Sequence, residues 1–114
     1  MGRWAQYRKR GTAPASGFPL PAPLLTDFLL ADAGGGDGTI QLETTLPAGA
    51  TAYRASVLVN SMPFPDADFT PVTDPNTLVS GDPGDIITSG IAWLVALGGP
   101  QLSPFSPTQT IELS

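Results

Sequence analysis

The sequence predicts an all-β protein, a β-sandwich built from about six or seven short strands. Apolar and polar residues alternate over several short segments, which is the period of a half-buried strand. Thirteen glycines and thirteen prolines punctuate these segments, and no stretch convincingly predicts a helix. With 114 residues and 41% hydrophobic side chains, the chain suffices for one compact domain and is too short for two.

The first predicted element is residues 24–32, LLTDFLLAD. This segment is apolar without a clean period of two, so it is a strand or one short helical turn, and we favour the strand. Residues 33–38, AGGGDG, end it. Although this segment is similar to a phosphate-binding glycine loop, neither GK[ST] nor a helix follows it, so we predict a turn between strands.

Two strands with clear alternation follow. Residues 39–46, TIQLETTL, place four alternate residues on one face: Ile40, Leu42, Thr44 and Leu46. After a turn at 47–49, residues 51–60, TAYRASVLVN, place a second set on one face: Tyr53, Ala55, Val57 and Val59. Both segments predict half-buried strands.

The next region is rich in proline. Five prolines fall within residues 61–85, so any strand there is predicted to be short or to lie at a sheet edge. The best candidates are residues 67–72 and 76–80, and DPGD at 82–85 predicts a turn.

Residues 86–97, IITSGIAWLVAL, are predicted to form the central strand. Its second half places four large apolar side chains on one face: Ile91, Trp93, Val95 and Leu97. Gly98 to Pro100 end this strand, and residues 108–113 give the last one, with Ile111 and Leu113 inward.

Residues 24–114 resemble a fibronectin type III-like domain, a member of the immunoglobulin-like (Ig-like) sandwiches. The resemblance rests on PAPLLTDFLL, on TIQLETTLPAGATAYRASVLV and above all on the ending IAWLVALGGPQLSPFSPTQTIEL. Two features depart from the family: TIQLETTL lacks the usual tryptophan, and IIT at 86–88 stands where a tyrosine is expected. The resemblance implies an Ig-like β-sandwich with an extended N-terminal arm, in which we expect Trp93 to fill the missing tryptophan's place.

The chain divides into a basic arm (1–11), a proline-rich strap (12–23) and the predicted sandwich (24–114). Residues 1–10 contain four of the five cations and no acid, whereas residues 11–114 contain one cation and ten acids, a net charge of minus nine. Apolar anchors beside cations are typical of protein docking. The predicted docking residues are Arg3, Trp4, Tyr7, Arg8, Lys9, Arg10, Phe18 and Leu20. Phe18 and Leu20 could alternatively pack against the body.

As a whole, the chain resembles the small structural proteins of tailed bacteriophage particles. That resemblance implies a non-enzymatic virion protein, made in the bacterial host cytoplasm. It would be anchored by its arm to capsid, neck or tail subunits, in many copies within a symmetric assembly. The alternative is a module that binds carbohydrate or a host surface glycan through Phe64, Phe69 and Phe105, which we expect on loops. A nucleic-acid-binding arm is a weaker hypothesis, because an acidic body repels a polyanion.

Several kinds of site are not expected. The chain has no Cys and no His, which removes thiolate and imidazole chemistry and most zinc, copper and haem ligation. Five acids could suggest calcium, but their spacing lacks an EF-hand's ligand run, so we expect no metal: Asp66, Asp68, Asp74, Asp82 and Asp85. No cofactor, catalytic residue or membrane partner is expected. The longest apolar run, residues 91–97, is far shorter than the ~20 residues of a spanning helix.

Overall fold

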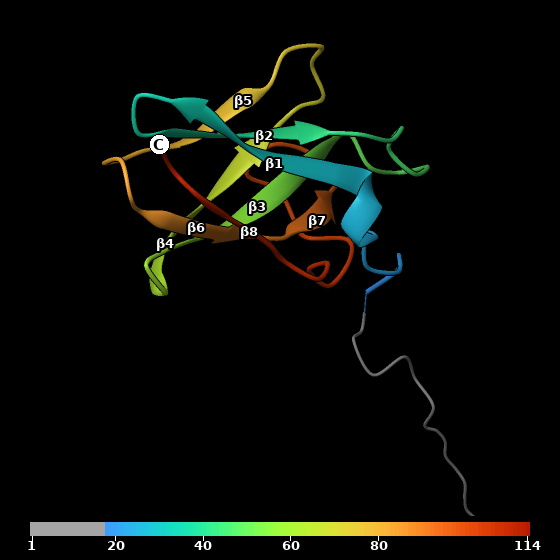
Figure 1. Cartoon of the computed structure of the whole chain (residues 1–114). Helices are drawn as coiled ribbons and strands as arrows, with labels where there is room; N and C mark the ends of the chain where they lie inside the picture. The colour runs from blue at the N-terminus through green and yellow to red at the C-terminus, as the bar shows by residue number, and fades with distance from the viewer. Residues whose placement is uncertain (1–17) are drawn as a thin grey trace, which may run out of the picture.

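The structure, a computed structural model, describes residues 18–114, which form two antiparallel sheets packed face to face (Figure 1). This confirms the predicted all-β sandwich. One sheet has the order β1-β2-β5 and the other β4-β3-β6-β8, with β7 also paired to β3. The strands are β1 (Phe28–Gly34), β2 (Asp37–Leu42), β3 (Ala52–Val59), β4 (Met62–Phe69), β5 (Asn76–Ser80), β6 (Ile86–Ser89), β7 (Ile91–Leu94) and β8 (Gln109–Glu112).

Both alternatives considered for residues 24–32 occur, one after the other. A single 3-10 turn, η1 (Leu25–Asp27), precedes β1, and the Asp27 carboxylate accepts a hydrogen bond from the Leu24 N–H at 2.8 Å. The predicted turn between β1 and β2 is confirmed at residues 35–36. Gly36 has a φ of 83°, and a Cβ there would overlap the backbone oxygen of Gly81, so only glycine fits this position.

β3 is the central strand of the larger sheet. It pairs with β4, β6 and β7, so the prediction that residues 86–97 form the central strand is wrong. The predicted inward residues of β3 are all buried, namely Tyr53, Ala55, Val57 and Val59. β2 is shorter than predicted: it ends at Leu42, after which the Glu43 N–H donates to the Asp27 carbonyl at 2.7 Å.

The strand predicted at 67–72 exists but begins and ends earlier than predicted, and only residues 67–69 of the predicted segment belong to it. β4 runs over Met62–Phe69, straight through Pro63 and Pro65, and it pairs only with β3. An edge strand tolerates proline because a missing N–H on its outer side costs no hydrogen bond within the sheet. β5 occupies residues 76–80 as predicted.

Residues 86–97 form two strands rather than one. Gly90 separates β6 from β7, and a Cβ there would lie 2.8 Å from the Ser106 backbone oxygen. The predicted inward positions of Val95 and Leu97 are wrong, since they are 39% and 57% exposed. The strand ends at Leu94, and the chain turns back so that the Val95 N–H donates to the Pro100 carbonyl at 3.3 Å.

A serine- and proline-containing segment, residues 101–107, takes the free edge of β7. The N–H groups of Leu102 and Ser106 donate to the carbonyls of Trp93 and Ile91, both at 2.8 Å. In return, the Trp93 N–H donates to the Ser103 hydroxyl at 2.9 Å and the Ile91 N–H to the Ser106 hydroxyl at 3.0 Å. A proline, which has no N–H, follows each of these serines. The two buried serine hydroxyls therefore accept the hydrogen bonds of the β7 N–H groups.

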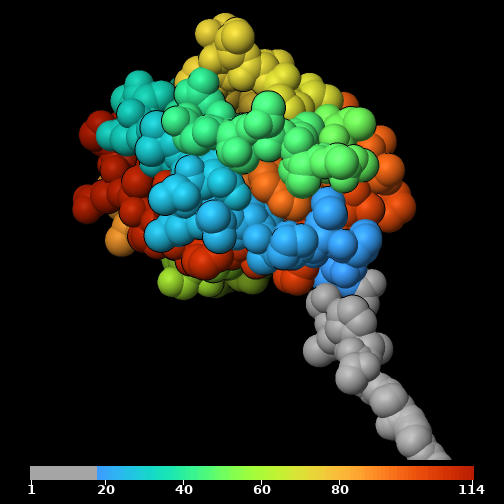
Figure 2. Space-filling view, turned by 90° about the vertical axis from the view of Figure 1, so that its right-hand side faces the viewer, coloured from blue at the N-terminus to red at the C-terminus, as the bar shows by residue number. Residues whose placement is uncertain are grey.

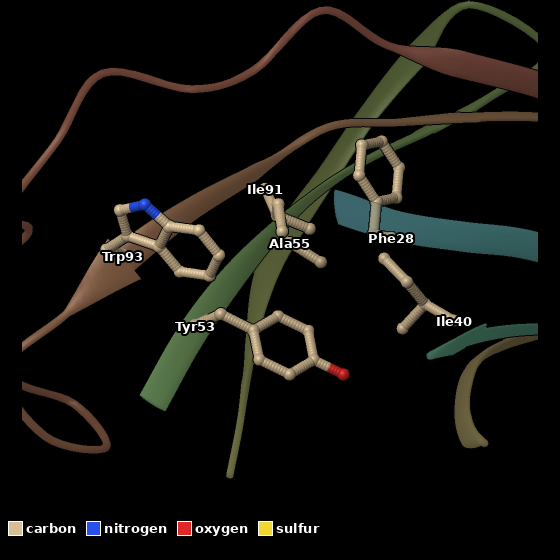
Figure 3. Close-up of a cluster of buried hydrophobic side chains, with 6 residues drawn as sticks. All are labelled: Phe28, Ile40, Tyr53, Ala55, Ile91 and Trp93. Carbon is tan, nitrogen blue, oxygen red and sulfur yellow. The ribbon is translucent and has the colours of Figure 1, made fainter. Parts of the chain in front are cut away.

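The core lies between the sheets. Figure 3 shows its larger cluster, Phe28, Ile40, Tyr53, Ala55, Ile91 and Trp93. Trp93 is 5% exposed, so the expectation that it lies in the core is confirmed. A second cluster contains Leu30, Ile87 and Leu113. Each large apolar side chain buried in this way stabilises the fold by about 1.5–3 kcal/mol before conformational entropy is subtracted.

Candidate docking surface

The predicted docking residues fall into two groups. Arg3, Trp4, Tyr7, Arg8, Lys9 and Arg10 lie outside the described residues, so their role stays a prediction. Leu20 is described: its side chain packs against the larger core cluster and its N–H donates to the Leu102 carbonyl at 3.0 Å. Phe18 is half-buried and Pro23 is buried. Of the two alternatives left open for Leu20, packing against the body is the one observed.

The strap therefore fixes where the chain enters the sandwich. Figure 2 shows the first described residues lying against the later, orange-to-red part of the chain. In Figure 1 the chain enters at one end of the sandwich, whereas Ser114 lies at the other end.

Almost all of the negative charge of residues 18–114 has no cation beside it. Arg54 is the one cation among residues 18–114, and it is held by Asp68 through Nε–Oδ1 and Nη2–Oδ2 contacts of 2.8 and 3.0 Å. The hydrogen bond from Arg54 lowers the pKa of Asp68, and Asp68 raises the pKa of Arg54. With one of the ten acids paired in this way, nine carry charge that no cation of the body offsets. Such a surface favours a cationic partner.

The five acids considered for calcium are spread over the described chain. Asp68 is paired with Arg54, and Asp85 accepts hydrogen bonds from the Asn60 side chain and the Asp82 N–H, both at 3.1 Å. Residues 18–114 contain no group of three or more acids placed to hold a metal ion. No pocket opens on their surface. No helix within them is long and apolar enough to cross a bilayer.

The carbohydrate hypothesis expects three phenylalanines on loops, and for two of them this expectation is wrong. Phe64 and Phe69 belong to β4. The Phe69 ring contacts the buried Tyr53 ring at a centroid distance of 5.7 Å and packs on the core. Phe105 is half-buried in the serine- and proline-containing segment, so only Phe64, at 49%, is largely exposed.

Sequence reasoning missed one surface, the pair Met62 and Phe64, which we call the ledge. Met62 pairs with Val59 and Phe64 with Val57, and both valines face the core. The ledge residues therefore share the inner face of their sheet, yet they are 64% and 49% exposed. The sequence signal for this strand is the alternation in MPFP, and Pro63 and Pro65 oppose it.

The two lateral sides of the sandwich differ. We call the side where β1 meets β8 the closed side and the side bounded by β4 and β5 the open side. On the closed side, Gln109 of β8 accepts from the Leu30 N–H at 2.9 Å and donates to the carbonyls of Leu25 and Phe28 at 3.0 and 2.7 Å. On the open side, Asn76 of β5 donates to the Tyr53 hydroxyl at 2.9 Å.

Comparison with known proteins adds no relationship: no family model matches the chain, and no curated protein matches it significantly.

Proposed function

We propose that this chain is a non-enzymatic virion structural protein of a tailed bacteriophage, in which an Ig-like, fibronectin type III-like module is anchored through its arm to capsid, neck or tail subunits. The order of strands supports the module. The chain crosses from β2 to the other sheet, and β5 returns to lie beside β2, which is a Greek-key connection.

The observation that carries the docking role is the separation of charge along the chain. Four cations and two aromatic residues stand in residues 1–10, and the body they precede holds nine unopposed acids. Cationic and aromatic side chains next to one another are suited to burial against another protein's surface. The strap is held at one end of the sandwich through Leu20, so a docked arm would leave the opposite end of the body pointing away from the subunit that binds it.

The test uses phage particles assembled with the full chain or with variants of its arm. The fourfold variant R3E/R8E/K9E/R10E reverses the arm's charge, and R3K/R8K/R10K preserves it as the matched control. We expect the first variant to fold, by circular dichroism, and to fall at least about tenfold in copies per particle, since each 1.4 kcal/mol of lost affinity is tenfold. The control should incorporate normally. Normal incorporation of the charge-reversed variant would show that the arm is not the anchor.

A further inference from the structure

Two of the connections between the sheets contain the dipeptide Asp–Pro. Asp74 and Pro75 lie between β4 and β5, and Asp82 and Pro83 lie between β5 and β6. All four residues are exposed, so water reaches both peptide bonds. An aspartate carboxyl can attack its own main-chain carbonyl carbon, after which the proline nitrogen, which belongs to a tertiary amide, leaves as an amine. The two bonds share this chemistry, so only the surrounding structure can distinguish them.

The peptide bond after Asp82 is held in a tight turn. Pro83 and Gly84 occupy the two central positions, and Gly84 has a φ of 96°, which is the pattern of a type II turn. The Asp85 N–H donates to the Asp82 carbonyl oxygen at 3.1 Å. This oxygen belongs to the Asp82–Pro83 bond and gains negative charge when its carbon is attacked. The turn therefore supplies a fixed donor that stabilises this charge.

Asp85 also fixes the residue that would make the attack. Its Oδ2 accepts a hydrogen bond from the Asp82 N–H at 3.1 Å, and its Oδ1 accepts one from the Asn60 side chain at 3.1 Å. Both main-chain groups of Asp82 are thus bound to one residue. Within residues 18–114, the Asp82 carboxylate itself accepts no hydrogen bond, so it is free to rotate toward its own carbonyl carbon.

The bond after Asp74 has none of these features. In the described part of the chain, no N–H donates to the Asp74 carbonyl and no group binds its carboxylate. The nearest such contact is one residue earlier, where the Gln41 side chain donates to the Thr73 carbonyl at 2.8 Å. The molecule therefore contains its own reference, an exposed Asp–Pro bond without the turn.

The chain is anchored on both sides of the Asp82–Pro83 bond. Before it, the Gly81 N–H donates to the Gly36 carbonyl at 2.8 Å, and after it the Gly84 N–H donates to the Leu113 carbonyl at 2.7 Å. In Figure 1 this connection lies at the end of the sandwich marked C. Residues 83–114 also contain β6 and β7, which pair with β3. A break at this bond would leave both parts held in one fold.

We propose that the folded chain cleaves its own Asp82–Pro83 bond in acidic solution. A carboxyl oxygen of Asp82 bonds to the main-chain carbonyl carbon of the same residue, the carboxyl proton passes to the Pro83 nitrogen, and the C–N bond breaks. The products are a cyclic anhydride at Asp82 and a proline amine, which takes up a proton and cannot attack the anhydride. One water then opens the anhydride to two carboxyl groups, so the net reaction is hydrolysis without electron transfer. This inference goes beyond the proposed function and does not depend on the arm.

The reaction needs a proton on the Asp82 carboxyl, so its rate should rise as the pH falls. The titratable groups near this turn, on the turn itself and on the elements that contact it, are all acids. They are Asp32, Asp37, Asp85 and Glu112. Arg54, the one cation of residues 18–114, is bound to Asp68. No cation of the described chain therefore holds the Asp82 carboxylate in its charged form.

The experiment follows the full chain by mass spectrometry in buffers from about pH 7 to about pH 3, with circular dichroism to find the lowest pH at which it stays folded. We expect two fragments, residues 1–82 and 83–114, whose masses together exceed that of the chain by one water. In the folded chain this cleavage should be at least about tenfold faster than cleavage after Asp74. In urea at the same pH, the two bonds should be cleaved at similar rates. Equal rates in the folded chain, no cleavage after Asp82, or the same preference in urea overturns the inference.

Two variants test the parts of the mechanism. D82E retains the carboxyl but must close a larger ring, so cleavage should slow at least about tenfold, whereas D74E, the matched control, should leave it unchanged. D85A removes the acceptor that fixes the Asp82 N–H, so the preference over Asp74 should shrink. Cleavage of D82E at the wild-type rate, or an unchanged preference in D85A, contradicts the mechanism. Either failure would leave the proposed function standing, because incorporation into particles does not use this bond.

Discussion

The closed and open sides bound the same sandwich, yet they are held in different ways. On the closed side, one glutamine side chain from β8 makes three hydrogen bonds to the backbone of β1 and the turn before it, and Asp32 accepts from the N–H and hydroxyl of Ser114 at 3.1 and 2.5 Å. On the open side a single side-chain hydrogen bond crosses between the sheets, from Asn76 to Tyr53. Among the described residues, polar side-chain contacts are thus more numerous on the closed side than on the open side.

The largest expected effect is on the closed side. Gln109→Ala should lower the free energy of unfolding by about 2–3 kcal/mol, because it removes three hydrogen bonds and leaves the Leu30 N–H without its acceptor. Urea denaturation measures this loss. Gln41→Ala is the matched control: it removes one exposed hydrogen bond, to the Thr73 carbonyl, and should cost less than about 1 kcal/mol. Equal losses for the two variants would show that Gln109 does not close this side.

The next largest effect is on the open side. Asn76→Ala should cost about 1–2 kcal/mol, because the buried Tyr53 hydroxyl loses its partner. The same tie has a pH dependence. Burial raises the pKa of Tyr53, against a smaller lowering by the Asn76 hydrogen bond, so the folded chain holds the phenol proton more tightly than the unfolded chain.

Stability from Tyr53 is therefore complete below the ordinary pKa of tyrosine and is lost as the pH rises through the raised value. Urea titrations at alkaline pH should show this decline in the wild type and a smaller decline in Tyr53→Phe. Identical alkaline profiles would contradict the assignment.

A smaller effect, of opposite sign, is expected at the turn that joins β3 to β4. Asn60 and Ser61 have φ angles of 51° and 67°, which glycine adopts without strain. Ser61→Gly should raise the free energy of unfolding by about 0.5–1 kcal/mol. Asn60→Gly should instead destabilise, because the Asn60 side chain bonds Asp85 and the Ile86 N–H. Thermal denaturation of both variants distinguishes these outcomes.

The smallest effect concerns Asp32, which is exposed. Its pKa is lowered, first by the hydrogen bond from the Ser114 hydroxyl and then by the Gly34 N–H. Because the folded pKa is below the unfolded one, this contribution is present above the ordinary pKa of aspartate and is lost as the pH falls through the lowered value. Asp32→Asn should flatten the acid limb of the stability profile slightly. An acid limb as steep as in the wild type would show that the contact adds no stability.

The sequence predicted the elements that local residue patterns determine, and it failed where the position of a strand in the sheet decides. β3 followed from alternation, β5 was one of two candidate strands in the proline-rich region, and the turn at Gly35 and Gly36 followed from glycine content. β4 could not be placed, because proline opposes a central strand and is harmless at an edge, and position in the sheet is a tertiary property. The break at Gly90 likewise depends on how close Ser106 approaches.

The candidate site divides in the same way. Charge separation made the arm visible in the sequence. The alternation in MPFP is compatible with a strand, but the exposure of Met62 and Phe64 on the inner face of their sheet is a tertiary property that the sequence does not contain. Leu20 was predicted as a docking residue, with packing against the body as the alternative, and the structure shows the alternative, which the sequence could not choose because it depends on the core that Leu20 meets.

The serine- and proline-containing segment along β7 protects this edge of the sheet against aggregation. It accepts hydrogen bonds from β7 through hydroxyls, and Pro104 and Pro107 leave gaps in its own row of amide donors. A further strand laid against it would find an incomplete template, so runaway β-aggregation cannot propagate from that flank.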